Sequence, residues 1–270
     1  MSIRTTGQAI DEALAQGRKA LIGYLTAGFP DLDGSVEAAR VLVDHGADII
    51  ELGLPYSDPG MDGPIIQRTG QLALERGTRV DDVLRAVERV AATGAAVVIM
   101  TYWNPVLRRG VDTFARQLAE AGGAGLITPD LPPEEAASWI AASDSHGLDR
   151  IFLVAPSSRR ERLASISAAS RGFVYTASRM GVTGLQTSVD SHASGLVQRT
   201  RAAGAPRVCV GIGVSTGVQA AEVAQYADGV IVGSALLATL SDEDQPFPAR
   251  LDRLAALADD LAAGVRTPAS

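Results

Sequence analysis

Short runs of apolar, β-branched residues recur along the whole chain. Eight runs stand out, at residues 20–25, 48–52, 96–100, 125–128, 150–154, 172–176, 207–211 and 229–232. Each run is almost continuously hydrophobic, which is typical of strands that are covered on both faces. The pattern therefore predicts eight buried strands.

Amphipathic helical patterns lie between these runs. In residues 35–44, Val36, Ala39 and Val43 fall on one stripe, and Asp33 is placed to cap the start of the helix. Similar patterns cover residues 80–92, 111–121, 133–143, 159–169, 189–203 and 216–224. Strands that alternate with helices, without a linker or a break in composition, predict a (β/α)8 TIM barrel that forms one domain over residues 1–270.

Two segments lie outside this repeat. Residues 8–16 place Ile10, Ala13 and Leu14 on one side, which predicts an extra N-terminal helix that covers the bottom of the barrel. The tail that begins at Gly264, residues 264–270, is expected to be frayed.

The composition is that of a globular protein with ample material for a core, since 46% of the 270 residues are hydrophobic and 20% are charged. The net charge of −7 and the lack of a Lys/Arg-rich block argue against nucleic-acid binding. The N-terminus does not resemble a signal peptide, and the longest apolar run, residues 95–100, is too short to span a membrane. These features predict a cytoplasmic protein that binds neither nucleic acid nor membrane.

The cysteine and histidine residues indicate no metal site. The single cysteine, Cys209, stands between two valines and is interpreted as a small buried hydrophobic residue rather than a nucleophile. The three histidines, His45, His146 and His192, lie far apart without the spacing of metal ligands. We expect them at the surface or at helix ends.

Two acids mark the second strand and the loop that follows it. Glu51 interrupts an apolar strand, and Asp62 lies in the Gly/Pro-rich stretch ELGLPYSDPGMDGPIIQ of residues 51–67. Active sites of this fold lie at the carboxyl ends of the strands, and burial should raise the pKa of Glu51. The pair is therefore a candidate for proton transfer to and from one substrate. The structural alternatives are a buried ion pair for Glu51 and a turn for Asp62.

Three glycine-bearing turns predict a phosphate site. They are residues 181–184, 211–215 and 233–234, which follow the sixth, seventh and eighth strands. Glycines let the backbone approach a ligand, and helix N-termini attract anions. The alternative is that they are ordinary tight turns.

The loop of residues 178–187 is long enough to form a lid over the barrel, or else it is an exposed loop. Tyr24, Tyr102 and Tyr175 each lie near the carboxyl end of a strand. They are candidates to line an aromatic-accepting pocket, with core packing as the alternative.

Together these motifs resemble the α subunit of tryptophan synthase over essentially the whole chain. The resemblance rests on ELGLPYSDP with DGPIIQ, on SRMGVTG at residues 178–184, on Gly211-Ile-Gly213 and on Gly233-Ser234. The first motif is highly specific, whereas the others alone would not be. The chain departs from the family's pattern at Tyr24 and Ile212, where phenylalanine is common, and at Pro129, which replaces a small residue.

The resemblance implies retro-aldol cleavage of indole-3-glycerol phosphate to indole and glyceraldehyde 3-phosphate, with no metal or cofactor in this chain. Glu51 would protonate C3 of the indole and then take the proton of the glycerol hydroxyl. Asp62 would accept the indole N–H, and Thr183 would close with the lid and orient Asp62. The N–H groups that bind the phosphate would be those of Gly184, Gly213, Gly233 and Ser234. The residues around the indole ring would be Tyr24, Met100, Ile127, Leu153, Tyr175 and Val232.

The resemblance also implies a partner, a pyridoxal-phosphate β subunit that receives indole through a tunnel in an α2β2 tetramer. Pro55, Ser57, Asp58 and Pro59 would face this partner. Three alternatives remain: a stand-alone indole-releasing lyase, another barrel that acts on a phosphorylated metabolite, and a binding subunit that only activates a partner. The two acids, Glu51 and Asp62, argue against the last two.

Overall fold

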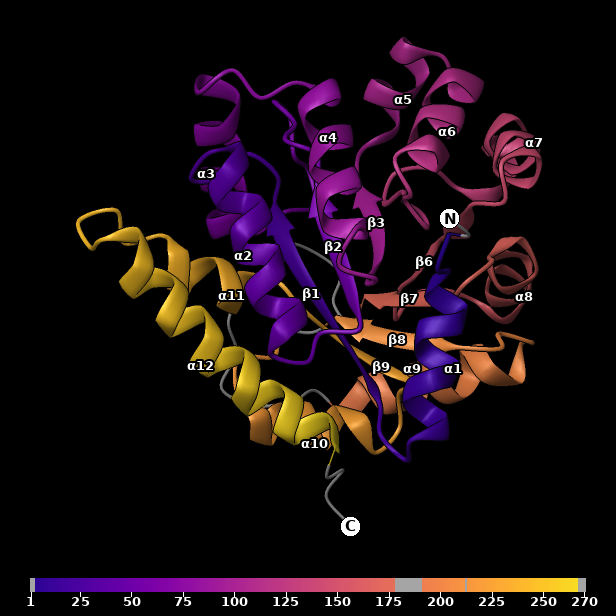
Figure 1. The fold of residues 1–270 in the computed structure, drawn as a ribbon. Helices are drawn as coiled ribbons and strands as arrows, with labels where there is room; N and C mark the ends of the chain where they lie inside the picture. The colour runs from indigo at the N-terminus through magenta and orange to yellow at the C-terminus, as the bar shows by residue number, and fades with distance from the viewer. Residues whose placement is uncertain (1–2, 178–190, 212, 267–270) are drawn as a thin grey trace.

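A computed structural model describes residues 3–177, 191–211 and 213–266 of the chain (Figure 1). Its strands form one nine-stranded sheet, in the order β5-β4-β3-β2-β1-β9-β8-β7-β6, and all the paired strands are parallel. The strands are β1 (Ala20–Thr26), β2 (Ile49–Gly53), β3 (Ala96–Met100), β4 (Gly125–Ile127), β5 (Asp149–Ile151), β6 (Leu153–Val154), β7 (Val174–Ala177), β8 (Val208–Gly211) and β9 (Gly229–Val232).

The ninth strand results from a break within the predicted fifth strand. β5 pairs with β4 and β6 pairs with β7, and only Phe152 separates β5 from β6. The ring therefore closes through one interrupted strand, and the remaining strands match the predicted runs. The prediction of a (β/α)8 TIM barrel is confirmed.

Helices surround the sheet, as Figure 1 shows for α2, α4, α6, α7, α8, α10 and α12. The helices are α1 (Thr6–Ala15), α2 (Leu32–Asp44), α3 (Pro64–Glu75), α4 (Val80–Ala91), α5 (Trp103–Arg109), α6 (Val111–Glu120), α7 (Ala137–Ser145), α8 (Arg160–Ala169), α9 (Ser191–Ala202), α10 (Gly217–Ala224), α11 (Ser234–Leu240) and α12 (Phe247–Arg266), with the 3-10 helix η1 (Pro133–Glu135). Three of these helices, α3, α5 and α12, were not predicted from the sequence. The stretch 64–67, read as part of a loop, is the first turn of α3.

The N-terminal helix lies where the sequence predicted it. α1 covers the amino end of the barrel, with Ala9, Ile10 and Ala13 fully buried in the interior cluster. The Thr6 backbone N–H and hydroxyl both donate to Asp149 at the start of β5, at 2.8 and 2.6 Å. The extra helix is therefore fastened to the barrel by apolar packing and by one buried carboxylate.

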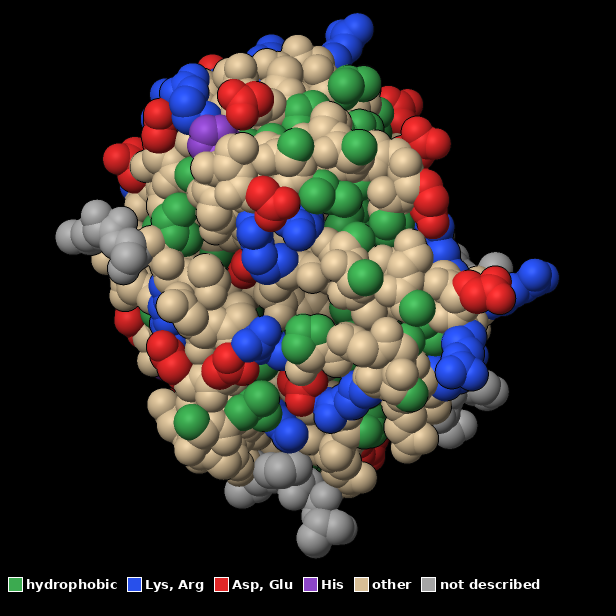
Figure 2. Space-filling model, turned by 90° about the vertical axis from the view of Figure 1, so that its right-hand side faces the viewer, with side chains coloured by type: hydrophobic (Ala, Val, Ile, Leu, Met, Phe, Trp, Pro, Cys, Tyr) green, Lys and Arg blue, Asp and Glu red, His purple; other side chains and the backbone are tan. Residues whose placement is uncertain are grey.

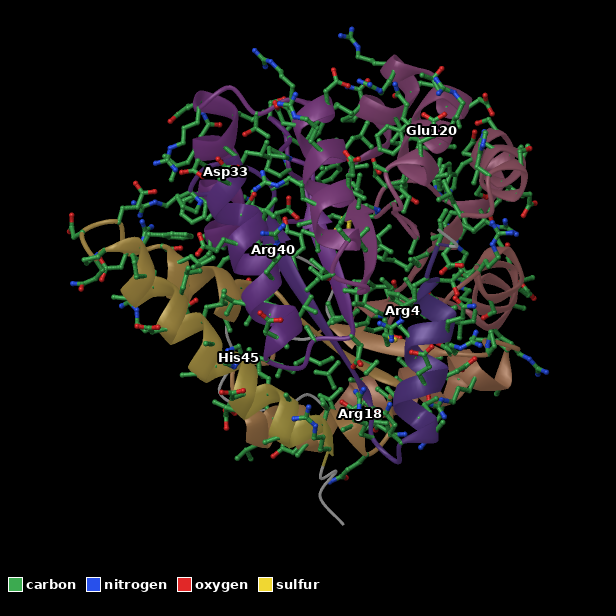
Figure 3. All side chains as sticks on the ribbon, viewed as in Figure 1. Arg4, Arg18, Asp33, Arg40, His45 and Glu120 are labelled. Atoms are coloured by element: carbon green, nitrogen blue, oxygen red, sulfur yellow. The ribbon has the colours of Figure 1, made fainter. Side chains whose placement is uncertain are left out.

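Two boundary predictions need correction. The cap of α2 is Asp31, whose extended backbone lets its side chain accept the Gly34 N–H at 2.7 Å. Asp33 lies inside the first turn and pairs with Arg89 instead (Figure 3 shows Asp33 on the outer surface). The tail does not fray from Gly264, because α12 continues to Arg266 and buries Gly264 against the Gly217 carbonyl. Residues 267–270 lie outside the described residues.

The structure places Cys209, His45 and His146 where the sequence predicted them, in the core and at helix ends. Cys209 is fully buried, and burial raises the pKa of its thiol. His45 and His146 are the C-terminal caps of α2 and α7 and pair with Asp259 and Asp112. Within the described ranges, no cluster of His, Cys, Asp and Glu is arranged to hold a metal ion.

The outer surface carries both signs of charge. On the face in Figure 2, blue and red side chains are interspersed, with no large region of one sign. Among the helices of the described part of the chain, none has the length and hydrophobicity needed to cross a membrane.

Candidate active site

Glu51 lies inside the barrel. β2 alternates its side chains, and Glu51 is in register with Tyr24 on β1 and Val98 on β3. The side chain is 1% exposed, and its Oε2 atom makes no hydrogen bond within the described part of the chain. Burial, and then the nearby Asp62, raise its pKa to about 8. The carboxyl group is therefore mostly protonated at neutral pH and able to donate a proton.

Asp62 lies in the segment of residues 54–63, which links β2 to α3. Burial raises its pKa to about 6, and a hydrogen bond from the Tyr102 hydroxyl opposes that rise. The Gln67 amide donates to the Asp62 backbone carbonyl at 2.8 Å, which ties the segment to the first turn of α3. Asp62 is thus mostly ionised at neutral pH. The two acids therefore hold opposite protonation states at the same pH, as acid–base catalysis requires.

Five of the six residues predicted to surround the aromatic ring share the inner face of the barrel. Strand pairing aligns Met100 with Ile127 and Leu153 with Tyr175, and Tyr24 is aligned with Glu51. Met100, Leu153 and Tyr175 are partly exposed and pack against the interior cluster. These side chains form an apolar wall beside the two acids.

Val232 is the sixth residue predicted to surround the ring, and its predicted position on the inner face of the barrel was wrong. On β9 the interior positions are Gly229, which abuts the Cys209 sulfur, and Ile231, which belongs to the interior cluster. Because side chains alternate along a strand, Val232 points outward to the helices. Ile231 was not predicted at this site; the two-residue period of the strand puts it on the face opposite to Val232 but does not show which face lies inside.

Two glycines make room for two tyrosines at the mouth of the barrel. A Cβ atom at Gly53 would overlap the Tyr24 hydroxyl, and one at Gly211 would overlap the Tyr175 hydroxyl. Each ring therefore lies across the end of the neighbouring strand. Burial raises the pKa of both tyrosines well above the usual value, so both remain neutral hydroxyls.

The glycine turns predicted to bind phosphate are partly described. Gly213 follows β8 with a φ of 78°, a conformation that favours glycine. Gly233 is the N-terminal cap of α11, and Ser234 is its first residue, largely buried. Thr183 and Gly184, together with the predicted lid of residues 178–187 and Ile212, lie outside the described residues. The structure thus brings two of the three predicted turns to the same end of the barrel.

The predicted partner-facing residues lie on the outer side of the segment that carries Asp62. Ser57 and Asp58 are exposed and hydrogen bonded to each other at 2.6 Å, while Pro55 and Pro59 are partly exposed. Beside them is a hollow of about 400 Å³, whose lining residues are Tyr56, Ser57, Pro59, Pro64, Gln67, Arg68 and Gln71.

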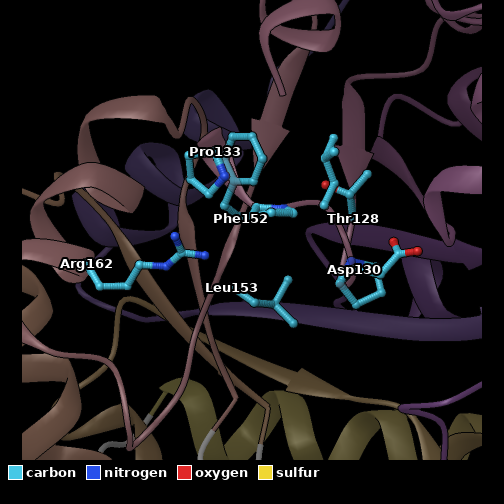
Figure 4. A pocket seen from close by; sticks show the side chains of 9 residues that line it. Thr128, Asp130, Pro133, Phe152, Leu153 and Arg162 are labelled. Atoms are coloured by element: carbon cyan, nitrogen blue, oxygen red, sulfur yellow. The ribbon is translucent and has the colours of Figure 1, made fainter. Parts of the chain in front are cut away.

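A smaller hollow of about 160 Å³ lies beside the mouth, between the segments that follow β4 and β5 (Figure 4). Thr128, Phe152, Leu153 and Arg162 are among the residues that line it. Asp130 also lines it, and its carboxylate accepts the Trp103 N–H at 2.9 and 3.0 Å, which fixes the start of α5.

A parallel TIM barrel with a buried, mostly protonated carboxyl group at its carboxyl-terminal end, and an ionised one in the next loop, has the layout of an enzyme of this fold. A sequence model of the tryptophan synthase alpha chain family matches residues 10–266. The chain belongs to this family, which confirms the resemblance seen in the sequence.

Related sequences and solved structures agree with this family assignment. The tryptophan synthase alpha chains of Mycobacterium marinum and Mycobacterium tuberculosis H37Rv are each 58% identical over 260 residues, or 96% of this chain and 94% of theirs. A chain of Mycobacterium tuberculosis tryptophan synthase superimposes with a TM-score of 0.91 at 57% identity, covering 98% of this chain and 99% of that one. The subunit alpha of Legionella pneumophila gives a TM-score of 0.87 at 32% identity, with coverage of 98% and 99%.

Proposed function

We propose that this chain catalyses the α reaction of tryptophan synthase in tryptophan biosynthesis, the cleavage of indole-3-glycerol phosphate to indole and glyceraldehyde 3-phosphate. Membership of the alpha chain family supports this function. The observation that carries it is the buried carboxyl group of Glu51, which lies near Asp62 and whose Oε2 atom has no hydrogen-bond partner among the described residues. An acid kept protonated at neutral pH is what the first step of the cleavage needs.

In this proposal Glu51 acts twice. It first donates its proton to C3 of the indole, which places positive charge on the ring nitrogen. It then takes the proton of the glycerol hydroxyl next to the bond that breaks. The electrons of the broken C–C bond return to the ring as the hydroxyl carbon becomes the aldehyde. Glu51 thus ends the cycle protonated.

Asp62 stabilises the charged ring. Its carboxylate accepts the indole N–H and so favours the positive charge that develops there. The apolar wall of the mouth holds the ring in place, with Ile231 in the position first assigned to Val232. Thr183 closes over the site and orients Asp62 in this proposal.

The phosphate is proposed to bind to backbone N–H groups. The residues that supply them are Gly184, Gly213, Gly233 and Ser234. Glycine turns before helices support this assignment, because N–H groups at a helix N-terminus point outward to an anion.

The partner is proposed to be a tryptophan synthase β subunit in an α2β2 tetramer. Pro55, Ser57, Asp58 and Pro59 form the surface that faces it, and their exposure beside a hollow supports this orientation. Pyridoxal phosphate belongs to the β subunit, and this chain works without a cofactor.

The test is indole release from indole-3-glycerol phosphate by the purified chain, with and without a tryptophan synthase β subunit. We expect slow release that rises sharply when the partner is added. High activity of the chain alone would favour a stand-alone lyase, and no indole under either condition would contradict the proposed reaction.

A further inference from the structure

Tyr102, directly after β3, contacts the segment that carries Asp62 at three points. Its hydroxyl accepts the Met61 N–H at 2.8 Å, and its proton is left to interact with the nearby Asp62 carboxylate, which lowers the pKa of that carboxyl against the effect of burial. Its ring stacks on Tyr56 with centroids 4.9 Å apart. One hydroxyl can make both interactions, because it has one proton and two lone pairs. Tyr102 thus connects the frame of the barrel to both ends of this segment.

Tyr102 is itself firmly held. The Thr101 N–H donates to the Ile127 carbonyl at 3.1 Å, and the Thr101 hydroxyl donates to the Tyr102 carbonyl at 3.1 Å. On the other side, the Asp130 carboxylate accepts the N–H of Trp103. The side chain of Tyr102 is largely buried. Its hydroxyl therefore has a fixed position relative to the strands.

The segment that it contacts is more exposed. Ser57, Asp58, Gly60 and Met61 all face solvent. The Leu54 N–H is bonded to the Met100 carbonyl at 2.9 Å, which fixes only the start of the segment. An exposed segment whose carboxylate must meet a substrate needs a rigid contact near that carboxylate.

We propose that Tyr102 is a positioning residue that holds the Asp62 carboxylate where it accepts the indole N–H of the substrate. This inference rests on the proposed function. The hydroxyl also favours the ionised form of Asp62, since donation to a carboxylate lowers its pKa while burial raises it. Asp62 interacts electrostatically with Glu51, Tyr24 and Tyr175, and Tyr102 also interacts with Asp130. Of these groups, only Tyr102 also accepts the Met61 N–H and stacks on Tyr56, so only its hydroxyl is tied to the segment that carries Asp62.

The experiment is the pH dependence of kcat and kcat/KM for indole release by the α chain with its β partner, in the wild type and in Tyr102→Phe. The variant keeps the ring and its stacking on Tyr56 but loses the hydroxyl. We expect kcat to fall about tenfold, the cost of one hydrogen bond to a charged group. The acid limb of kcat/KM should move up by about one pH unit, because Asp62 loses its donor. The alkaline limb, set by Glu51, should change less.

Tyr226→Phe is the matched control, because Tyr226 precedes β9 at the opposite end of the barrel. It should reproduce the wild-type profile. Incorporation of 3-fluorotyrosine at position 102 provides an independent variant with nearly unchanged shape. Its more acidic hydroxyl is a stronger donor, so the acid limb should move to lower pH.

An acid limb that stays at the wild-type pH in Tyr102→Phe overturns the assignment, whatever the loss in kcat, because a packing defect alone lowers kcat without moving the limb. If that variant does not fold by circular dichroism, the 3-fluorotyrosine protein decides in the same way. If the wild-type complex releases no indole, the proposed function fails, and this inference fails with it.

Discussion

The buried carboxylates at the two ends of the barrel differ in their hydrogen-bond partners. At the amino end, Asp48 accepts two hydrogen bonds from Arg18 and one from the Leu21 N–H, and Asp228 accepts from Arg201 and from the Val208 N–H. Figure 3 shows Arg18 at this end, close to α1. At the carboxyl end, Glu51 is as deeply buried, but its Oε2 atom has no hydrogen-bond partner in the part of the chain that the structure describes.

This difference indicates that the paired carboxylates at the amino end stabilise the fold, whereas Glu51 at the carboxyl end serves catalysis. A paired buried carboxylate joins elements of the fold, because breaking it leaves its donors unsatisfied. An unpaired one costs stability when charged, so its pKa rises toward the working pH, where it can exchange protons. Substitution of a carboxylate at the amino end should therefore mainly lower stability. Substitution of an acid at the carboxyl end should mainly lower activity.

The largest effect should be on turnover. Glu51→Gln and Asp62→Asn should both fold and bind a phosphate-bearing ligand, yet release indole roughly a thousandfold more slowly, the range for loss of an acid or base. Steady-state kinetics with the β partner measures this effect. Near-wild-type turnover by either variant would remove that residue from its catalytic role.

Asp149→Ala tests the amino end. The change leaves the Thr6 N–H and hydroxyl without their acceptor under α1. We expect the free energy of unfolding to fall by about 3 kcal/mol, measured by urea denaturation. Asp112→Ala is the exposed control, since Asp112 is 77% exposed in its pair with His146 and should cost less than about 1 kcal/mol. Equal losses in the two variants would contradict the comparison.

Glu51→Gln should also stabilise the folded chain at high pH. The folded-state pKa of Glu51, about 8, is above the usual 4.5, so the wild type loses stability as pH rises from 4.5 through 8. Glutamine does not titrate, so the variant should gain about 4–5 kcal/mol over the wild type at pH 9 relative to pH 4. Urea denaturation at both pH values measures the difference. A constant difference would show that Glu51 is not held protonated.

The smallest expected effect is the change of kcat/KM with pH in the wild-type protein. Asp62 ionises above about 6 and Glu51 deprotonates above about 8, so kcat/KM should be highest between these values. Initial rates at fixed ionic strength would show a bell-shaped profile. A flat profile from pH 5 to 9 would contradict the assignment of opposite protonation states.

The sequence by itself determined the architecture and the main acids. The strands can be recognised as continuous apolar runs between amphipathic stretches, because strands inside a barrel are covered on both faces. Glu51 stood out because a carboxylate in such a run is costly unless it is used. These two signals are local, since each depends on neighbours within a few residues.

Only the tertiary structure decided which side chains meet. The interior position of Ile231 instead of Val232 follows from strand register, and a shift of one residue reverses the facing of every side chain. The role of Tyr102 depends on its hydrogen bond from Met61, 41 residues away, and the interruption at Phe152 depends on how the ring of strands closes. The close fit of Gly53 to Tyr24 likewise joins two strands. Such contacts arise from packing between elements distant in the chain, and no local pattern records them.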